Sequence, residues 1–577
     1  MSLARLAPGL AALGASTRAG LGADLRAGLA SAAVGLPASL AFAQLMDLPP
    51  ATALQASILP TVAYALFGCS RRLVVAADTA TCVLIAGSLS AMGLVEPELR
   101  AAYAAVLALL AGVFCLGAGW LRLGAVADFL AWPILVGFLN GVAIDLAIAQ
   151  LPRMLGLPSD AAEAPARLLA LARNLPLLHP ATALAAFGTL ALLLGLRRAA
   201  PRLPAALIAC AAAGLASWLL DLAGLGVATL GAIPDALPGL ALPDVTLAGL
   251  MQHRDELLEN AAGIALISFA SFMVPVRAFA ARRGESTDAD REVVALGIAH
   301  LVAGLAQGFA VSGSTTRTAS AEAAGAEGPA AALFAAALLA LAMAALGGPL
   351  GLLPHAAMAA LLVQASLSLL DLRAIGTLWR LDRTEAALAI VATLGVLLVG
   401  PLTAVLLSVG LAVARFIRLT ARPVAEELGR LSGTPGFHSR RVHPAAHTEP
   451  GMIFFRFNAP IVFFNAAAFQ RAALAAADAA EPGLEWFVLD LFPITQVDVT
   501  GLETLRVVNE RLAACGVRLV GAGRRTELQQ WLALSESALD RANVLLFPTM
   551  NAARHAFRAA RKAKAEAASA PAGGGRG

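Results

Sequence analysis

Charged side chains are scarce in this chain. Asp, Glu, Lys and Arg make up 14% of its 577 residues, hydrophobic residues make up 59%, and the mean hydropathy is +0.76. A soluble protein of this length needs more charge on its surface, so the composition excludes that class and predicts a polytopic protein of the lipid bilayer. The net charge of +4 gives no indication of nucleic-acid binding, and we expect none.

Motifs that carry covalent chemistry are also missing. The five cysteines stand singly, without a disulfide framework or the spacing of metal ligands. No glycine-rich loop of the kind that cradles phosphates is present. We therefore expect a protein that is not an enzyme, has no metal site, needs no cofactor and is not driven by ATP.

Apolar runs dominate what the sequence does contain. The charge-free sequence 329–370 is too long for one span, and its central glycines and prolines predict two helices and a turn. Arginines cluster at the connections between apolar runs, and by the positive-inside rule we expect both termini to be cytoplasmic, in a multi-pass protein of the cell inner membrane. Other charge-free stretches long enough to cross a bilayer are 27–46, 48–70, 101–121, 174–196 and 386–414.

One polar, turn-prone stretch interrupts the apolar sequence at 304–326, GLAQGFAVSGSTTRTASAEAAGA. Its hydroxyl residues favour the N-cap of a helix, and a helix that begins there directs unpaired N–H groups and the positive end of its dipole at whatever precedes it, which suits an anion. A second short apolar run follows Asp78 and Thr79. Two interrupted segments in the two halves of a transporter indicate its substrate site; the alternative is an ordinary loop between helices.

The composition changes after about Thr420. We predict a cytosolic leader at 1–23, a transmembrane domain at 24–420, a linker at 421–447, a small α/β domain at 448–560 and a disordered tail at 561–577. Within the small domain the pattern predicts strands at 451–457, 460–464, 486–492 and 517–523, and helices at 466–480 and 501–514.

Five segments, taken in order and spacing, resemble the SulP family of anion transporters, the sulfate-permease group that includes prestin and pendrin. The last of them is similar to a STAS domain, and the resemblance covers nearly the whole chain. The segments are LPASLAFAQLMDLPP (36–50), FGCSRRLVVAADTA (67–80), 119–156 with its GFLNG core, EVVALGIAHLVAGLAQGFAVSGSTTRTASAEAAG (292–325) and VLDLFPITQVDVTGLETL (488–505).

The resemblance implies a polytopic α-helical membrane protein of about fourteen spans, built as a 7+7 inverted repeat with core and gate domains, plus a cytosolic STAS domain. It also implies alternating access and a homodimer with STAS contacts. The third and tenth spans would be half-helices whose N-termini meet at the substrate. The site residues carried over are Phe42, Asp78, Thr79, Ser271, Ser314, Thr315, Thr316 and Arg317.

This chain departs from the family pattern at three places. Ala38 replaces the usual Gln, Ala76-Ala77 replaces a Gly-Pro, and Ser271 stands where many members have a carboxylate. Without that acid, coupling to H⁺ or Na⁺ through the eighth span is in doubt. Our hypothesis is that Asp78 takes over the coupling role; the alternative is that Asp78 caps its helix and pairs with Arg317.

Several other residues have competing interpretations. Arg317 either binds the anion directly or points away and supplies only its field, and the second needs less desolvation. We interpret Asp145 as paired to a structural partner, and His300 and His355 as packing or interfacial groups. In the STAS-like domain, Val499 follows Asp498 where related bacterial regulators have a phosphorylatable serine, so we expect no such switch, with Thr500 capping the next helix.

These features predict a secondary transporter of a small anion: sulfate, bicarbonate, chloride or a dicarboxylate. Transport driven by H⁺ or Na⁺ through Asp78 is one hypothesis. An uncoupled exchanger or anion conductance is the nearest alternative, and a non-transporting sensor or scaffold that signals through the STAS-like domain is another. A nucleobase permease is disfavoured by the sequence SGSTTR and by the STAS-like segment.

Overall fold

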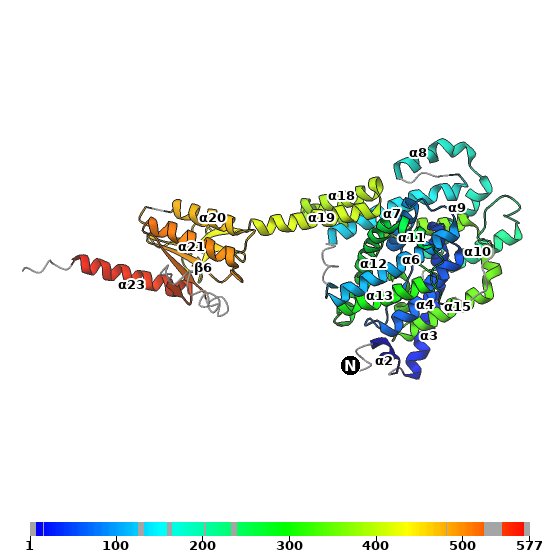
Figure 1. Ribbon diagram of the computed structural model, residues 1–577, viewed down its shortest axis with the longest axis horizontal. Coiled ribbons are helices and arrows are strands. Elements are labelled where there is room, and N and C mark those ends of the chain that lie inside the picture. The colour runs from blue at the N-terminus through cyan, green and yellow to red at the C-terminus, as the bar shows by residue number, and fades with distance from the viewer. Residues whose placement is uncertain are drawn as a thin grey trace, which may run out of the picture. The chain divides into compact units, whose positions relative to one another are not determined.

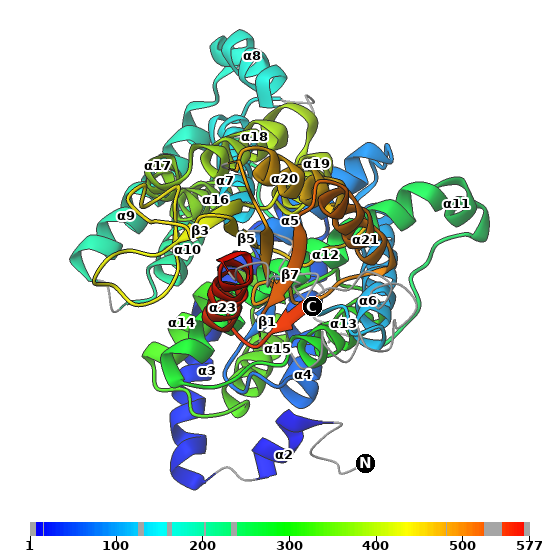
Figure 2. The ribbon, with the colours of Figure 1, turned by 90° about the vertical axis from the view of Figure 1, so that its left-hand side faces the viewer.

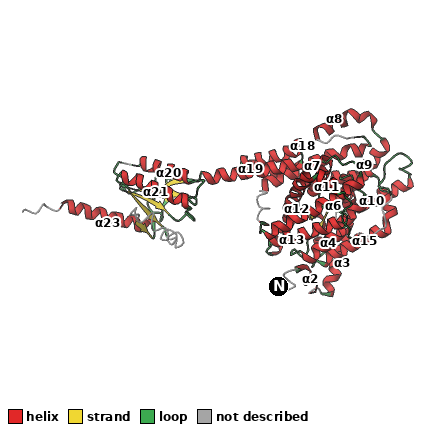
Figure 3. Ribbon diagram, viewed as in Figure 1, coloured by secondary structure: helices red, strands yellow, loops and turns green. Residues whose placement is uncertain are grey.

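The chain divides into two compact units, Met1–Ala412 and Val413–Gly577, in the computed structural model (Figure 1). We describe each unit by itself. Helices make up nearly all of the first unit, and the strands of the second form one sheet (Figure 3). The structure describes residues 7–14, 17–124, 132–158, 164–200, 203–231, 239–480, 482–523 and 545–569.

The first unit is a helical membrane domain. Eight of its described helical segments are long and apolar enough to cross a membrane, and α5 and α10 are shorter apolar helices. The helices are α2 (Pro8–Gly14), α3 (Arg18–Leu45), α4 (Pro50–Phe67), α5 (Thr79–Ala91), α6 (Pro97–Trp120), α7 (Trp132–Leu155), α8 (Ala164–Asn174), α9 (Pro180–Ala199), α10 (Ala205–Leu219), α11 (Leu247–Gln252), α12 (Arg254–Arg283), α13 (Ala289–Leu305), α14 (Thr315–Ala323), α15 (Ala330–Gly351), α16 (His355–Leu369), α17 (Leu372–Leu381), α18 (Arg383–Val399) and α19 (Pro401–Ala421), the last extending into the second unit.

Packing partners repeat between the two halves of this domain. Helix α6 packs on α12 and α13, and α15 packs on α3 and α4 in the same way. Helix α5 contacts α12, and α14 contacts α3. Figure 2 shows α14 and α15 beside α3. In each of these pairs, a helix of the first half contacts the second half in the way that its counterpart in the second half contacts the first. This exchange confirms the predicted inverted repeat.

The helices fall into two groups that meet along α3. We call α3–α6 with α12–α15 the core group, and α7–α10 with α16–α18 the gate group. In the gate group α7 packs on α16 and α18, and α9 packs on α10 and α16. Helix α3 is the core helix that packs against both α10 and α16.

Three boundaries in the first unit bear on the sequence predictions. The charge-free sequence 329–370 forms α15 and α16 with a turn between them, as predicted. The apolar stretch 386–414 is divided at Gly400, whose φ of +89° suits glycine and which precedes Pro401. Helix α3 begins at Arg18, inside the predicted leader 1–23, because Thr17 caps its first turn at Gly20 N.

The second unit is a six-stranded mixed sheet in the order β4-β3-β5-β6-β7-β8. Its four strands from β5 to β8 are parallel, and β3 is antiparallel to β5. Alternate β5 residues face opposite sides: Phe455 packs with α20 and α21, and Phe454 packs with α23. The elements are β3 (Ala425–Gly429), β4 (His438–Ser439), β5 (Met452–Phe457), α20 (Ala466–Asp478), β6 (Trp486–Asp490), α21 (Val499–Ala514), β7 (Arg518–Ala522), β8 (Leu545–Phe547) and α23 (Met550–Ser569).

Three predictions for the second unit were wrong. The linker 421–447 contains β3 and β4 of the sheet. Residues 460–464 form only a single bridge, from Ile461 to Val497, because the Asn465 side chain accepts from Val462 N (2.9 Å) and donates to Pro460 O (2.9 Å) in a local turn that stops the strand from continuing. The predicted disordered tail overlaps α23, which is helical to Ser569; residues 570–577 lie outside the described part.

Candidate functional site

Two short strands bring the predicted half-helices together. The strand β1 (Val75–Ala76) pairs antiparallel with β2 (Ser312–Gly313). Helix α5 follows β1 and α14 follows β2, with Asp78 and Ser314 at their N-cap positions. Because the strands run in opposite directions, both helix N-termini are directed at the same strand pair, and the positive ends of their dipoles make it favourable for an anion.

Polar contacts with four surrounding helices hold this strand pair in place. The side chains of Thr61, His300 and Thr318 bond to backbone groups of residues 74, 75 and 311 that would otherwise be buried without partners, and the side chain of Ser312 donates to a backbone carbonyl of α12. The sequence interpretation missed all of these roles, and it treated His300 as a packing or interfacial group. The bonds are Thr61 Oγ1 to Val75 O (2.5 Å), Val74 N to Thr318 Oγ1 (3.0 Å), Ser312 Oγ to Ser268 O (2.8 Å) and His300 Nε2 to Val311 O (2.7 Å).

Arg317 points from the first turn of α14 into the core group. Its Nη2 donates to Gly35 O (3.1 Å) and to Ser39 Oγ (2.6 Å), both on α3, and the residue is 2% exposed. A Cβ at Gly35 would lie 2.9 Å from the guanidinium, so the guanidinium keeps its present position only while residue 35 is glycine. Of the two arrangements considered, the geometry has the one in which the guanidinium points away from the strand pair and is held by α3.

Asp78 is partly exposed, and the backbone N–H groups of Thr79, Ala80 and Thr81 face its carboxylate. Its side chain makes no capping hydrogen bond of ordinary geometry to the first turn of α5. Among the described residues, no ion pair joins Asp78 to Arg317, whose hydrogen bonds go to α3. The carboxylate thus lies at the first turn of α5, as the capping half of the alternative interpretation expects, and it is not paired with Arg317.

The hydroxyl residues at the two N-termini differ in exposure. Thr79 and Ser314 are 7% and 6% exposed, whereas Thr315 and Thr316 are exposed. Ser314 caps α14 by accepting from Arg317 N (3.4 Å). The site therefore presents both buried and accessible hydroxyl groups to a ligand. No group of three or more His, Cys, Asp or Glu side chains fit to hold a metal occurs in the part of the chain that is described.

The remaining predicted residues come from the neighbouring helices. Phe42 of α3 is buried in the same apolar cluster as Ala77 and Ala80, which flank the start of α5. Ser271 of α12 precedes Phe272, whose Cα would lie 3.3 Å from a Cβ placed on Gly313. Helix α12 therefore lies directly against β2, and Phe42 and Ser271 lie on helices adjoining the strand pair.

A buried carboxylate that the sequence interpretation did not single out lies behind β1. Glu292 of α13 is 0% exposed and accepts from Tyr64 Oη (2.8 Å) and from Ser70 Oγ (2.5 Å). Tyr64 lies in the last turn of α4, and Ser70 lies in the segment that leads from α4 to β1. Glu292 thus ties α13 to the chain that carries the first half-helix.

Two further residues have clear structural roles. Asp145 pairs with Arg167 of α8 at 2.8 Å, a structural partner of the kind expected. Asp498, and not Thr500, is the N-cap of α21: its Oδ1 accepts from Gly501 N (2.7 Å). The prediction that Thr500 caps this helix was wrong because α21 begins one residue before it, at Val499.

The first unit is a helical inverted repeat, and the N-termini of two of its helices converge on the strand pair β1–β2. This is the architecture of a membrane carrier for anions. The sulfate permease family matches residues 21–392, and the STAS domain matches residues 443–553. A probable sulfate transporter of Mycobacterium tuberculosis strain H37Rv is 36% identical over 528 residues, which cover 91% of this chain and 93% of that protein. Sulfate transporter 2.1 of Arabidopsis thaliana is 28% identical over 515 residues, 85% of this chain and 76% of that protein.

Solved structures share the fold at low identity. The murine Slc26a9 anion transporter in the inward-facing state aligns with a TM-score of 0.87 at 20% identity, over 96% of this chain and 94% of that one. The transmembrane domain of the cyanobacterial bicarbonate transporter BicA aligns with a TM-score of 0.60 at 22% identity, over 68% of this chain and 97% of that one. The chain belongs to the sulfate permease family: it is a multi-pass membrane transporter of anions with a C-terminal STAS domain, and not an enzyme.

Proposed function

We propose that this protein is a secondary active transporter that carries sulfate, or a closely similar small anion, by alternating access. The observation that supports it most is the convergence of the N-termini of α5 and α14 on the pair β1–β2. Relatives of this chain are named as sulfate transporters, which puts sulfate ahead of bicarbonate, chloride and dicarboxylates.

The binding chemistry follows from the donors at the two N-termini. Sulfate has four acceptor oxygens, which the first-turn N–H groups and the hydroxyls of Thr79, Ser314, Thr315 and Thr316 would share. Each helix N-terminus contributes about 0.3–1 kcal/mol, and up to about 2 kcal/mol where partly buried. Arg317 adds attraction through its field, and Phe42 provides an apolar wall that excludes water.

We propose that the charge of Asp78 couples the entry of the anion to the binding of a cation. A carboxylate and a unit negative charge about 5 Å apart repel by roughly 3 kcal/mol at an effective dielectric constant near 20, and a dianion doubles this. Binding of a proton or Na⁺ at Asp78 removes the repulsion, so the anion and the cation would travel together. Ser271, which replaces an acid, supports the alternative of uncoupled exchange or conductance.

The proposal extends to assembly and orientation. We propose a homodimer in an inner membrane, with both termini cytoplasmic as the arginine distribution indicates. The STAS domain exposes Phe463 (72%) and Val499 (80%), apolar side chains that contact with a second copy would cover. A sensor or scaffold without transport remains the alternative from another class.

Uptake of labelled sulfate, bicarbonate and fumarate into proteoliposomes, with and without an inward proton or Na⁺ gradient, tests these alternatives. Coupled transport predicts accumulation driven by one gradient, and Asp78→Asn should abolish that dependence while leaving exchange. Uptake that needs only internal anion would establish exchange. An absence of flux for every anion, in protein that retains its fold, would establish the scaffold alternative and overturn the proposal.

A further inference from the structure

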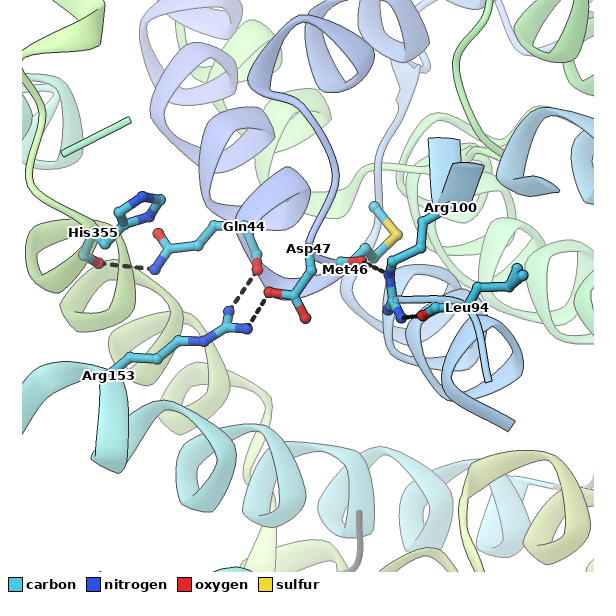
Figure 4. Close-up of polar contacts among 7 residues, drawn as sticks. All are labelled: Gln44, Met46, Asp47, Leu94, Arg100, Arg153 and His355. Carbon is cyan, nitrogen blue, oxygen red and sulfur yellow. Dashed lines mark hydrogen bonds and ion pairs between the residues drawn. The ribbon is translucent and has the colours of Figure 1, made fainter. Parts of the chain in front are cut away.

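A polar cluster joins the C-terminal end of α3 to helices of the gate group (Figure 4). Arg153 of α7 donates through Nη1 to Gln44 O (2.5 Å) and pairs through Nη2 with Asp47 Oδ1 (2.5 Å). Gln44 Nε2 donates to His355 O at the start of α16 (3.1 Å). One end of a core helix is thus held by two gate helices.

A second arginine makes a similar contact within the core group. Arg100 of α6 donates through Nε to Met46 O (3.0 Å) and through Nη1 to Leu94 O (2.8 Å), and it lies beside the same helix end in Figure 4. The last carbonyls of a helix have no partner within the helix and carry the negative end of its dipole, so cations stabilise them. Arg100 therefore anchors α3 inside its own group, whereas Arg153 reaches α3 from the other group.

The backbone at Asp47 places its carboxylate just beyond the end of α3. Asp47 has a φ of +52°, the left-handed region that favours glycine or asparagine after a helix. The chain keeps an acid at this less favourable position, and the acid meets Arg153. The side chain of Asp47 is 58% exposed and that of Arg153 is 30% exposed, so water reaches the ion pair and screens it. The contact is therefore weak enough to open and re-form.

We infer that Arg153 is a gate residue: with Asp47 and Gln44 O it forms a latch that holds this end of the transporter closed and has to release before the core and gate groups separate there. This inference rests on the proposed alternating access. The bonds of Arg153 go to Gln44 and Asp47, which are not residues of the anion site, so it acts as a positioning residue that sets the balance between two conformations. A contact that made closure too stable would trap the carrier, and a water-exposed pair avoids this.

The distance between the groups at this end can be measured directly by double electron–electron resonance. Spin labels at Val95→Cys, in the core group beside Leu94, and at Leu177→Cys, in the gate group, would be 87% and 64% exposed positions. Leu177 lies near the end of α7, because the nearby His179 N donates to Leu155 O (3.0 Å). The accessible native thiols Cys69 and Cys515 would first be replaced by serine.

We expect one dominant short distance in the parent protein and about a tenfold rise in the ratio of open to closed populations in Arg153→Gln, the scale of one lost charged hydrogen bond and ion pair. Arg153→Lys should fall between the two. The charge-swapped pair Asp47→Arg with Arg153→Asp should restore the short distance in part, because the ion pair returns without the bond to Gln44 O. Arg167→Gln, which removes an ion pair within the gate group, is the matched control and should leave the distances unchanged.

Equal distance distributions in the parent, Arg153→Gln and Arg167→Gln proteins would overturn the latch. So would a swapped pair that behaves like Arg153→Gln alone, because the loss would then be one of general packing. Uptake of sulfate, bicarbonate and fumarate measured on the same proteoliposomes separates this result from the proposed function. A shifted distance distribution in Arg153→Gln without any anion flux in the parent protein would support the latch and overturn transport. Anion flux without a shifted distribution would support transport and overturn the latch.

Discussion

At the scale of single residues, the placement of Arg317 depends on a glycine. A methyl group at Gly35 would lie 2.9 Å from the guanidinium, so Gly35→Ala should move that charge out of its bonds to Gly35 O and Ser39 Oγ. Overpacking of this kind costs about 1–3 kcal/mol. Because we propose that the field of Arg317 supports anion binding, we expect sulfate uptake at low concentration to fall about tenfold in proteoliposomes.

The same helix offers the control for this prediction. A Cβ at Gly22 of α3 would meet nothing within 4 Å. Gly22→Ala should therefore leave uptake unchanged and, through helix propensity, stabilise α3 by about 0.5–1 kcal/mol. Equal uptake by the two alanine variants would show that the position of the guanidinium does not matter to transport.

At the scale of elements, the segment before β1 is held by one buried carboxylate. Glu292→Gln replaces an acceptor oxygen by a donor that faces the hydroxyl of Tyr64 or Ser70, and a buried partner left unsatisfied costs about 1–3 kcal/mol. We expect a lower melting temperature in detergent together with weaker sulfate uptake, because α5 begins a few residues further on. Glu285→Gln, at a residue that is exposed just before α13, is the control and should change neither. A melting temperature unchanged by Glu292→Gln would contradict this role.

Local features of the half-helices could be predicted from sequence, and distant contacts could not. Asp78 and Ser314 end up at N-cap positions because capping depends on a few adjacent residues. The pairing of Ala76 with Ser312, and the bond of Arg153 to Gln44 O, join positions more than a hundred residues apart, and no local pattern encodes them. The strand β3 was missed for another reason: its sequence AEELG lacks the apolar alternation that marks a half-buried strand.

At the scale of the whole molecule, a transported anion has to stabilise the folded protein, because it binds a site that exists only after both halves of the repeat have come together. The strands β1 and β2 come from opposite halves, so unfolding either half removes the site. A ligand at one hundred times its dissociation constant contributes about 2.7 kcal/mol, which for a domain of this size raises the melting temperature by about 3 °C. Sulfate should give this rise relative to gluconate at equal ionic strength, and Gly35→Ala should reduce it while Gly22→Ala retains it. If bicarbonate or fumarate gives the larger rise, that anion and not sulfate is the substrate; if none does, the two N-termini do not form an anion site.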